Sequence, residues 1–206
     1  VVGELQGSFA DNWLQVRSEV IHGPDYFPHI QPDGTMTAQA YKSGPMGGGD
    51  TARLTYLMSF AAARKSILIS HAYFVPDADT TRALEGAVRR GVDVRVIVPG
   101  EFTDVPIVRQ ASRWHYELLL RRGIRIFEFQ PTMMHAKTMV VDGAWTTIGS
   151  SNFDDRSFRL NDEVNINVYN DDIAAQMETM FHEDLAQCEE VTLRKWFRRG
   201  WLDKTK

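Results

Sequence analysis

The sequence has 206 residues, of which 43% are hydrophobic and 24% are charged, the balance of an ordinary globular domain rather than a disordered or fibrous chain. No stretch approaches the roughly 18 consecutive apolar residues that a membrane-spanning helix needs. The net charge of −4 argues against a protein whose main task is to grip nucleic acid, because that binding depends on neutralising phosphates.

The beginning of the chain resembles its last predicted helix. An apolar stripe at four-residue spacing runs through residues 1–20, and the same spacing returns at the far end, in Val1, Leu5, Phe9 and Trp13 and in Ile173, Met177, Phe181 and Leu185. An aromatic residue stands third in both stripes, so we expect 1–20 to be the closing helix of a preceding, similar unit. The first residue is valine rather than methionine, and we therefore expect a piece of a longer protein.

Residues 21–49 contain several prolines and end in the glycine-rich string GPMGGG at 44–49. This composition is typical of a linker or an extended crossing segment.

Helices and strands alternate from residue 50 to residue 129. Asp50 is a suitable N-cap for the first helix, whose core face we expect to carry Leu54, Leu57, Met58 and Ala61. Two further helices are predicted after Asp77 and over 107–122, each ended by a glycine. The strands between them are predicted at 66–74, 92–98 and 124–129. The alternation predicts an α/β fold with a mixed, mostly parallel sheet flanked by helices on both faces.

After Pro131 the pattern changes to strand, turn, strand. Strands are predicted at 137–141, 145–148 and 163–169, and a last helix at 171–187. We therefore place the main folded unit at 50–190 and a basic aromatic tail at 191–206. The tail is expected to be solvated or to meet an anionic membrane surface through Arg194, Lys195, Arg198, Arg199, Lys204 and Lys206 beside Trp196, Phe197 and Trp201.

The string HAKTMVVDGAWTTIGSSN at 135–152 contains the residues that indicate chemistry. His135 and Lys137 are two apart, so on a strand both side chains face the same way and together offer a site for an anion. Histidine can act as nucleophile or proton donor near neutral pH, and lysine can neutralise phosphate oxygens. Asp142 stands at an odd spacing from Lys137, which favours a role in anchoring the turn over contact with substrate.

Three further residues complete the pattern. Ser150 and Asn152 repeat the two-residue spacing on the next strand and offer hydroxyl and amide contacts, while Glu163 begins a third strand and can orient an imidazole. A lone histidine on a strand is more often a packed or exposed residue than a catalyst. The whole gapped string is a far stronger signal than any one of its residues.

This string resembles the HKD motif of the phospholipase D superfamily, and its flanks are similar to the C-terminal half of bacterial cardiolipin synthases. The flanking similarity lies in YFVP at 73–76, RGVDVRVIV at 90–98, IRIFEFQ at 124–130 and DRSFRLN at 155–161. The resemblance implies a site in which two HKD motifs meet, one histidine forming a phosphohistidine while the other protonates the leaving alcohol. It implies neither a metal nor another cofactor.

The resemblance also implies residue roles. His135, in the second motif, would be the general acid and then the base, and Lys137 and Asn152 would bind phosphate. Ser150 and Glu163 would orient the histidines. The substrate would be a phospholipid and the acceptor the glycerol head group of phosphatidylglycerol. The parent protein would work at the bacterial inner membrane, with its catalytic part in the cytoplasm.

Two departures from the family pattern affect this prediction. No second HxK occurs in the sequence, so the chain supplies half of a site and needs either a missing N-terminal half or a second copy of itself. His71 stands where many cardiolipin synthases carry a Thr-Pro pair, and it faces either the substrate cleft or, the more common case, the core. Met133 and Met134 are interpreted either as an apolar lip for acyl chains or as packing.

Alternative functions remain open from the sequence alone. The motif also fits a phospholipase D that hydrolyses phospholipid, or a single-motif nuclease that dimerises, which the acidic charge disfavours. A non-catalytic interaction domain is disfavoured by the intact motif. The remaining histidines and the lone Cys188 lack the spacing of a zinc site, and one cysteine excludes an internal disulfide.

Overall fold

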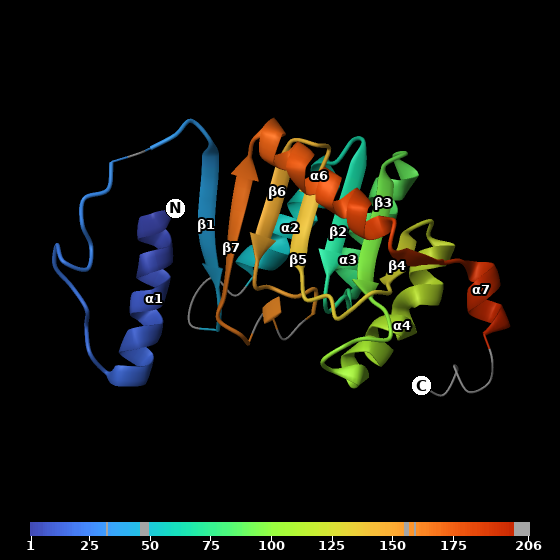
Figure 1. Cartoon of the computed structure of the whole chain (residues 1–206), viewed down its shortest axis with the longest axis horizontal. Coiled ribbons are helices and arrows are strands. Elements are labelled where there is room, and N and C mark those ends of the chain that lie inside the picture. The colour runs from blue at the N-terminus through green and yellow to red at the C-terminus, as the bar shows by residue number, and fades with distance from the viewer. Residues whose placement is uncertain (32, 46–49, 155–156, 159, 200–206) are drawn as a thin grey trace.

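The architecture is one eight-stranded sheet with helices on both faces (Figure 1). The computed structural model describes all residues except 32, 46–49, 155–156, 159 and 200–206. The described elements are, in chain order, α1 (Val2–Arg17), β1 (Thr37–Ser43), α2 (Thr51–Ala62), β2 (Ser66–His71), α3 (Ala78–Arg89), β3 (Asp93–Pro99), α4 (Pro106–Arg121), β4 (Arg125–Phe129), β5 (Lys137–Val141), β6 (Trp145–Gly149), β7 (Glu163–Tyr169), α6 (Asp171–Leu185), β8 (Cys188–Val191) and α7 (Leu193–Arg198).

The sheet is mixed, with the strand order β1-β7-β6-β5-β2-β3-β4-β8. Only β2, β3 and β4 run parallel to one another, and the other neighbours in the described sheet are antiparallel. The expected α/β class is confirmed, but the expectation of a mostly parallel sheet is wrong. The reason is local: a three-residue turn, 142–144, joins β5 to β6 and reverses the chain, and its first two residues, Asp142 and Gly143, have positive φ.

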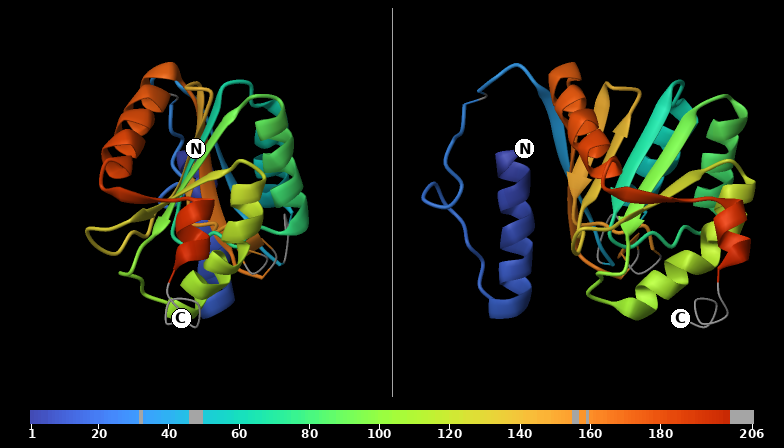
Figure 2. Two further views of the ribbon diagram at one scale, coloured as in Figure 1. Left: turned by 90° about the vertical axis from the view of Figure 1, so that its right-hand side faces the viewer. Right: turned by 45° about the vertical axis from the view of Figure 1, so that its right-hand side comes forward.

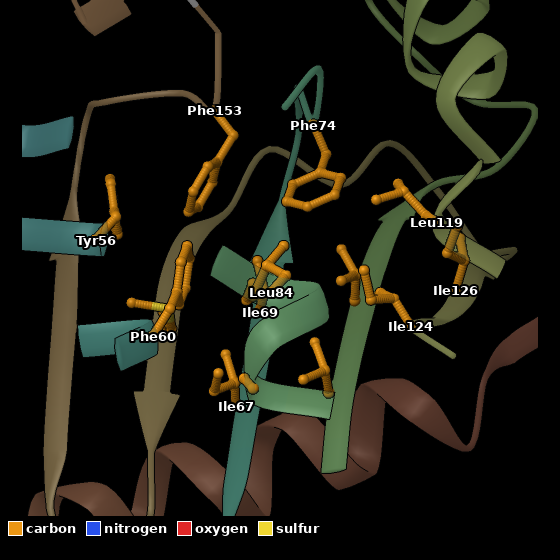
Figure 3. Packing of buried hydrophobic residues seen from close by; sticks show 14 of the residues in the cluster. Tyr56, Phe60, Ile67, Ile69, Phe74, Leu84, Leu119, Ile124, Ile126 and Phe153 are labelled. Atoms are coloured by element: carbon orange, nitrogen blue, oxygen red, sulfur yellow. The ribbon is translucent and has the colours of Figure 1, made fainter. Parts of the chain in front are cut away.

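Two hydrophobic cores lie on the two faces of the sheet. Seen along the sheet, α6 covers one face while α2 and α3 cover the other (Figure 2, left). The larger core joins α2, α3 and α4 to the sheet, and Figure 3 shows its aromatic and aliphatic side chains in contact, among them Tyr56, Phe60, Ile67, Ile69, Leu84 and Phe153. The helices of the alternating segment all contribute to the larger core, and the separately predicted last helix covers the other face.

Helix α2 presents a different face to the core from the one expected. Ala52, Tyr56 and Phe60 are buried, whereas Leu54 and Met58 are exposed. Both faces of this helix are apolar. The aromatic face is the buried one because Tyr56 and Phe60 pack their rings against Phe153, at centroid distances of 4.3 and 6.0 Å. Aromatic side chains bury more area than leucine or methionine, so this orientation removes more apolar surface from water.

Three elements lie in segments whose sequence does not predict them. Strand β1 lies inside the expected linker 21–49 and pairs with β7. Strand β8 lies at the end of the expected unit 50–190, and α7 lies inside the expected tail 191–206. Trp196 of α7 is buried against Tyr116, so this tail aromatic belongs to the core. Most of the GPMGGG string, and the tail beyond 199, fall outside the described residues.

Helix α1 confirms the helical stripe at the start of the chain, although it buries none of its residues. It lies beside β1 and contacts it through polar groups: the Glu4 carboxylate accepts from the Ala40 N–H at 3.1 Å, and Lys42 Nζ donates to Asp11 at 3.1 Å. Over the described part of the chain, no helix combines the length and the apolar character needed to cross a membrane.

Candidate active site

His135 and Lys137 meet where β5 begins. The loop between β4 and β5 runs along the lower edge of the sheet in Figure 1, and it delivers His135 just before the first residue of the strand. Lys137 Nζ lies 3.0 Å from His135 Nδ1 and also donates to the His135 carbonyl at 3.3 Å. Lys137 is buried, while 49% of the His135 side chain is exposed. The buried ammonium therefore contacts an imidazole that solvent can reach.

Tyr73 and Asp104 flank the histidine from the loops after β2 and β3. The Tyr73 hydroxyl donates to Asp104 Oδ2 at 2.5 Å, and that oxygen lies 3.6 Å from His135 Nε2. The Tyr73 ring meets the imidazole edge to face, and Lys137 Nζ lies 5.7 Å from the tyrosine ring centre. Lys137 Nζ also lies 3.4 Å from His135 Nε2, so both ring nitrogens are close to the ammonium and Nε2 is close to the Asp104 carboxylate as well.

The charges of these partners are stabilised by their surroundings. Burial, followed by the hydrogen bond to Asp104, raises the pKa of Tyr73 to about 12 and keeps the phenol a donor. The hydrogen bond from Tyr73 lowers the pKa of Asp104, which keeps that carboxylate ionised. Asp104 is absent from the sequence-based prediction, although one signal was present: it follows the carboxyl end of a parallel strand, where sites of α/β sheets collect.

Lys137 experiences two opposing influences. Burial lowers the pKa of its ammonium, while the carboxylates of Glu163, Asp104 and Asp154 act in the opposite direction. Burial outweighs the three carboxylates, so the pKa of Lys137 is lowered on balance.

Glu163 and Asn152 are joined through a serine. Asn152 Nδ2 donates to Ser157 Oγ at 3.2 Å, and that hydroxyl donates to Glu163 Oε1 at 3.0 Å. Asn161 Nδ2 reaches the same carboxylate oxygen at 3.2 Å. The buried Glu163 thus orders the segment that carries Asn152, and Ser157 and Asn161 are supporting residues that the sequence did not single out.

Ser150 makes contacts of a different kind. Its hydroxyl accepts from the Val164 N–H at 3.0 Å and donates to the Val164 carbonyl at 3.4 Å. These bonds extend the pairing of β6 with β7 beyond the end of β6. Ser150 therefore secures the backbone beside the site.

Asp142 lies at the opposite end of β5 from His135 and Lys137. Its carboxylate accepts from the backbone N–H groups of Arg64, Lys65 and Ser66 at 2.9, 2.7 and 2.9 Å. Burial acts to raise the pKa of Asp142, but these three hydrogen bonds outweigh it and the pKa is lowered. The motif residues therefore lie in two places: His135 and Lys137 at the start of β5, and Asp142 at the turn after its end.

His71 belongs to the core. It is fully buried, pairs across the strands with Lys137, and packs edge to face on Phe153 at a centroid distance of 4.6 Å. Burial, and then the charge of Lys137, lowers the pKa of His71 to about 3, so the ring is neutral. Of the two methionines before His135, Met133 is exposed and Met134 is buried in the core under α6.

Comparison with known proteins identifies relatives of this chain. Residues 56–185 match a family model described as "Cardiolipin synthase, PLD-like domain". Cardiolipin synthase A of Pseudomonas putida (strain W619) is 38% identical over 192 residues, which is 93% of this chain and 40% of that protein. Cardiolipin synthase A of Pseudomonas syringae pv. syringae is 36% identical over 197 residues. The chain thus spans about 40% of the length of these relatives.

Solved structures share the fold at lower identity. Nuc from Salmonella typhimurium, a phospholipase D family member, superposes with a TM-score of 0.66 at 23% identity, covering 77% of this chain and 99% of Nuc. Phosphatidylserine synthase of Haemophilus influenzae superposes with a TM-score of 0.63 at 14% identity, covering 87% of this chain and 44% of that one. The family match covers more than half of the chain, and the chain therefore belongs to the phospholipase D-like family of cardiolipin synthase domains.

Proposed function

We propose that this chain supplies one half of a phosphatidyl-transfer site of the cardiolipin synthase type. The observation that carries the proposal is the contact of the exposed His135 imidazole with the buried Lys137 ammonium at 3.0 Å, where β5 begins. Such a pair binds the oxygens of a phosphodiester and offers a titratable ring nitrogen beside them.

The proposed reaction has two steps. A histidine of the other half attacks phosphorus, a P–N bond forms, the P–O bond to the departing glycerol breaks, and His135 gives that oxygen a proton. The glycerol hydroxyl of a second phosphatidylglycerol then attacks phosphorus, His135 takes its proton, and the P–N bond breaks. Lys137 and Asn152 hold the phosphate oxygens, and Glu163 orders Asn152 through Ser157. The scheme uses no metal and no other cofactor.

The second histidine must come from outside these residues. Either it belongs to an N-terminal half of a longer protein, a proposal that the 40% coverage of the relatives supports, or a second copy of the chain provides it. We further propose that the protein works on phospholipid at the inner membrane of a bacterium, with its catalytic part in the cytoplasm.

Phosphatidyl transfer by the full-length protein on vesicles of phosphatidylglycerol tests the proposal. We expect cardiolipin to form, and the His135→Ala variant to lose about 100-fold to 10,000-fold in rate, the usual contribution of a general acid and base. The control is His182→Ala, at an exposed position of α6, which should transfer phosphatidyl groups at the wild-type rate.

Other products would identify other functions. If the protein releases only phosphatidic acid, water reaches the phosphohistidine and the protein is a hydrolase. If it leaves lipid untouched and cuts nucleic acid, the transfer proposal fails and only the phosphodiester chemistry of the motif remains.

A further inference from the structure

The outward face of α4 is apolar. Residues at the spacing i, i+4, i+7 and i+11 line that face, namely Ile107, Ala111, Trp114 and Leu118. Trp114 is 87% exposed and Ile107 is 72% exposed. The opposite face of the same helix is already in the core, through Ser112, Tyr116 and Leu119. A surface helix ordinarily presents polar residues to water, so this second apolar face needs a partner.

Cationic residues lie on α7, which packs against the C-terminal half of α4 and whose Lys195 is paired with Glu189 at 2.9 Å. The six residues of α7 include Arg194, Lys195 and Arg198 and no acidic residue. The half-exposed Phe197 of α7 lies 5.3 Å from the guanidinium of Arg121, the last residue of α4, which joins the two helices into one surface. We call this surface the α4–α7 patch; its members are Ile107, Trp114, Leu118, Phe197, Arg194 and Arg198. The chain as a whole is acidic, so its positive charge is local.

The patch begins beside the candidate active site. α4 starts two residues after Asp104, whose carboxylate lies 3.6 Å from His135 Nε2. Both Figure 1 and the right view of Figure 2 show the start of α4 at the lower end of the sheet, where the loop to β5 passes. With a rise of about 1.5 Å per residue, the apolar stripe extends roughly 16 Å from Ile107 to Leu118.

We propose that the α4–α7 patch docks on the surface of an anionic phospholipid bilayer. Charge complementarity selects this occupant: exposed tryptophan, isoleucine and phenylalanine enter the head-group region, and the flanking arginines meet lipid phosphates. The docking rests on the proposed phosphatidyl transfer in one respect, because it brings the site close to the lipid on which that reaction acts.

Sedimentation of the chain with vesicles tests the docking. The probes are vesicles of phosphatidylglycerol mixed with phosphatidylcholine, and vesicles of phosphatidylcholine alone. We expect binding to the anionic vesicles only, weakened about tenfold or more by Trp114→Gln combined with Ile107→Gln. Arg194→Gln and Arg198→Gln are each expected to weaken binding to the anionic vesicles about fivefold, and added salt should weaken binding further. Met58→Gln, on an exposed position of α2, is the matched control and should bind like the wild type.

Two results would overturn the docking. One is equal vesicle binding by the wild type and the Trp114→Gln/Ile107→Gln variant. The other is a wild-type oligomer, seen by light scattering, that this variant converts to monomer, since the face would then be a protein interface. Sedimentation needs no turnover, so a failure of phosphatidyl transfer leaves this measurement unaffected and the two proposals fail separately.

Discussion

Replacing Asp142 by asparagine removes a charge that joins two distant segments of the sheet. The carboxylate accepts three backbone N–H bonds, from Arg64, Lys65 and Ser66, at 2.7 to 2.9 Å. These bonds tie the turn after β5 to the start of β2, 76 to 78 residues earlier in the chain. Asparagine has the same shape and tolerates the φ of 56° at this position, so the substitution changes the charge and one acceptor atom.

The expected loss follows from the hydrogen bonds. A bond to a charged acceptor contributes about 1.5–3 kcal/mol, and solvent screening at a partly exposed turn brings each one below that range. Asparagine keeps one oxygen as acceptor and turns an NH₂ toward a donor. We therefore expect Asp142→Asn to lower the free energy of unfolding by about 2 kcal/mol.

The pH dependence has a definite sign. The folded-state pKa of Asp142 is lowered, so its contribution is complete above the unfolded value of about 3.9 and is lost as the pH falls through the folded value. The difference between wild type and variant should be full at pH 7 and should shrink in acid. Urea denaturation at pH 7 and at pH 3.5 measures it. Unchanged stability together with a loss of transfer by orders of magnitude would refute this reasoning and make Asp142 a catalytic residue.

Three further substitutions probe the site and its supports. Gly149→Ala should destabilise the fold by about 2 kcal/mol in thermal melts, because a Cβ would overlap the Asn165 side chain and lie 2.6 Å from a backbone carbonyl; an unchanged melting temperature would contradict the close approach. Tyr73→Phe removes the hydrogen bond that most lowers the pKa of Asp104, so the decline of the transfer rate in acid should begin at a higher pH than in the wild type. An identical pH profile would show that Asp104 does not affect the rate in this way. His71→Phe should remove a loss of stability of about 3 kcal/mol between pH 7.5 and pH 4.5, because the histidine binds a proton in the unfolded state but not when it is buried in the fold; equal losses of stability in wild type and variant, measured by urea denaturation at these two pH values, would contradict it.

Local signals in the sequence predicted local features of the fold. Asp77 caps α3 by accepting from the Thr80 N–H, and Gly91 and Gly123 take positive φ just beyond the ends of α3 and α4. The two-residue spacing of His135 and Lys137 likewise placed both side chains at one end of β5. Each of these features depends on residues a few positions apart, which a sequence displays directly.

Features that depend on distant partners were not predictable in the same way. The seven residues of β1 are mostly small or polar and form a strand because β7, more than a hundred residues later, pairs with them. The face of α2 depended on Phe153, which packs against Tyr56 and Phe60. Asp104 joins the site only because parallel strands bring its loop beside His135.

The charges around Lys137 give a physical reason for a site completed by another half. Asp104, Asp154 and Glu163 act on the one ammonium of the motif, so the carboxylates among these described groups outnumber the lysine. A phosphodiester anion would be repelled there by more carboxylates than cations attract it. A second lysine and a second histidine, facing this edge from the other half, would reverse the balance. The carboxylates also act on Lys137 against the effect of burial, which lowers the pKa of its ammonium.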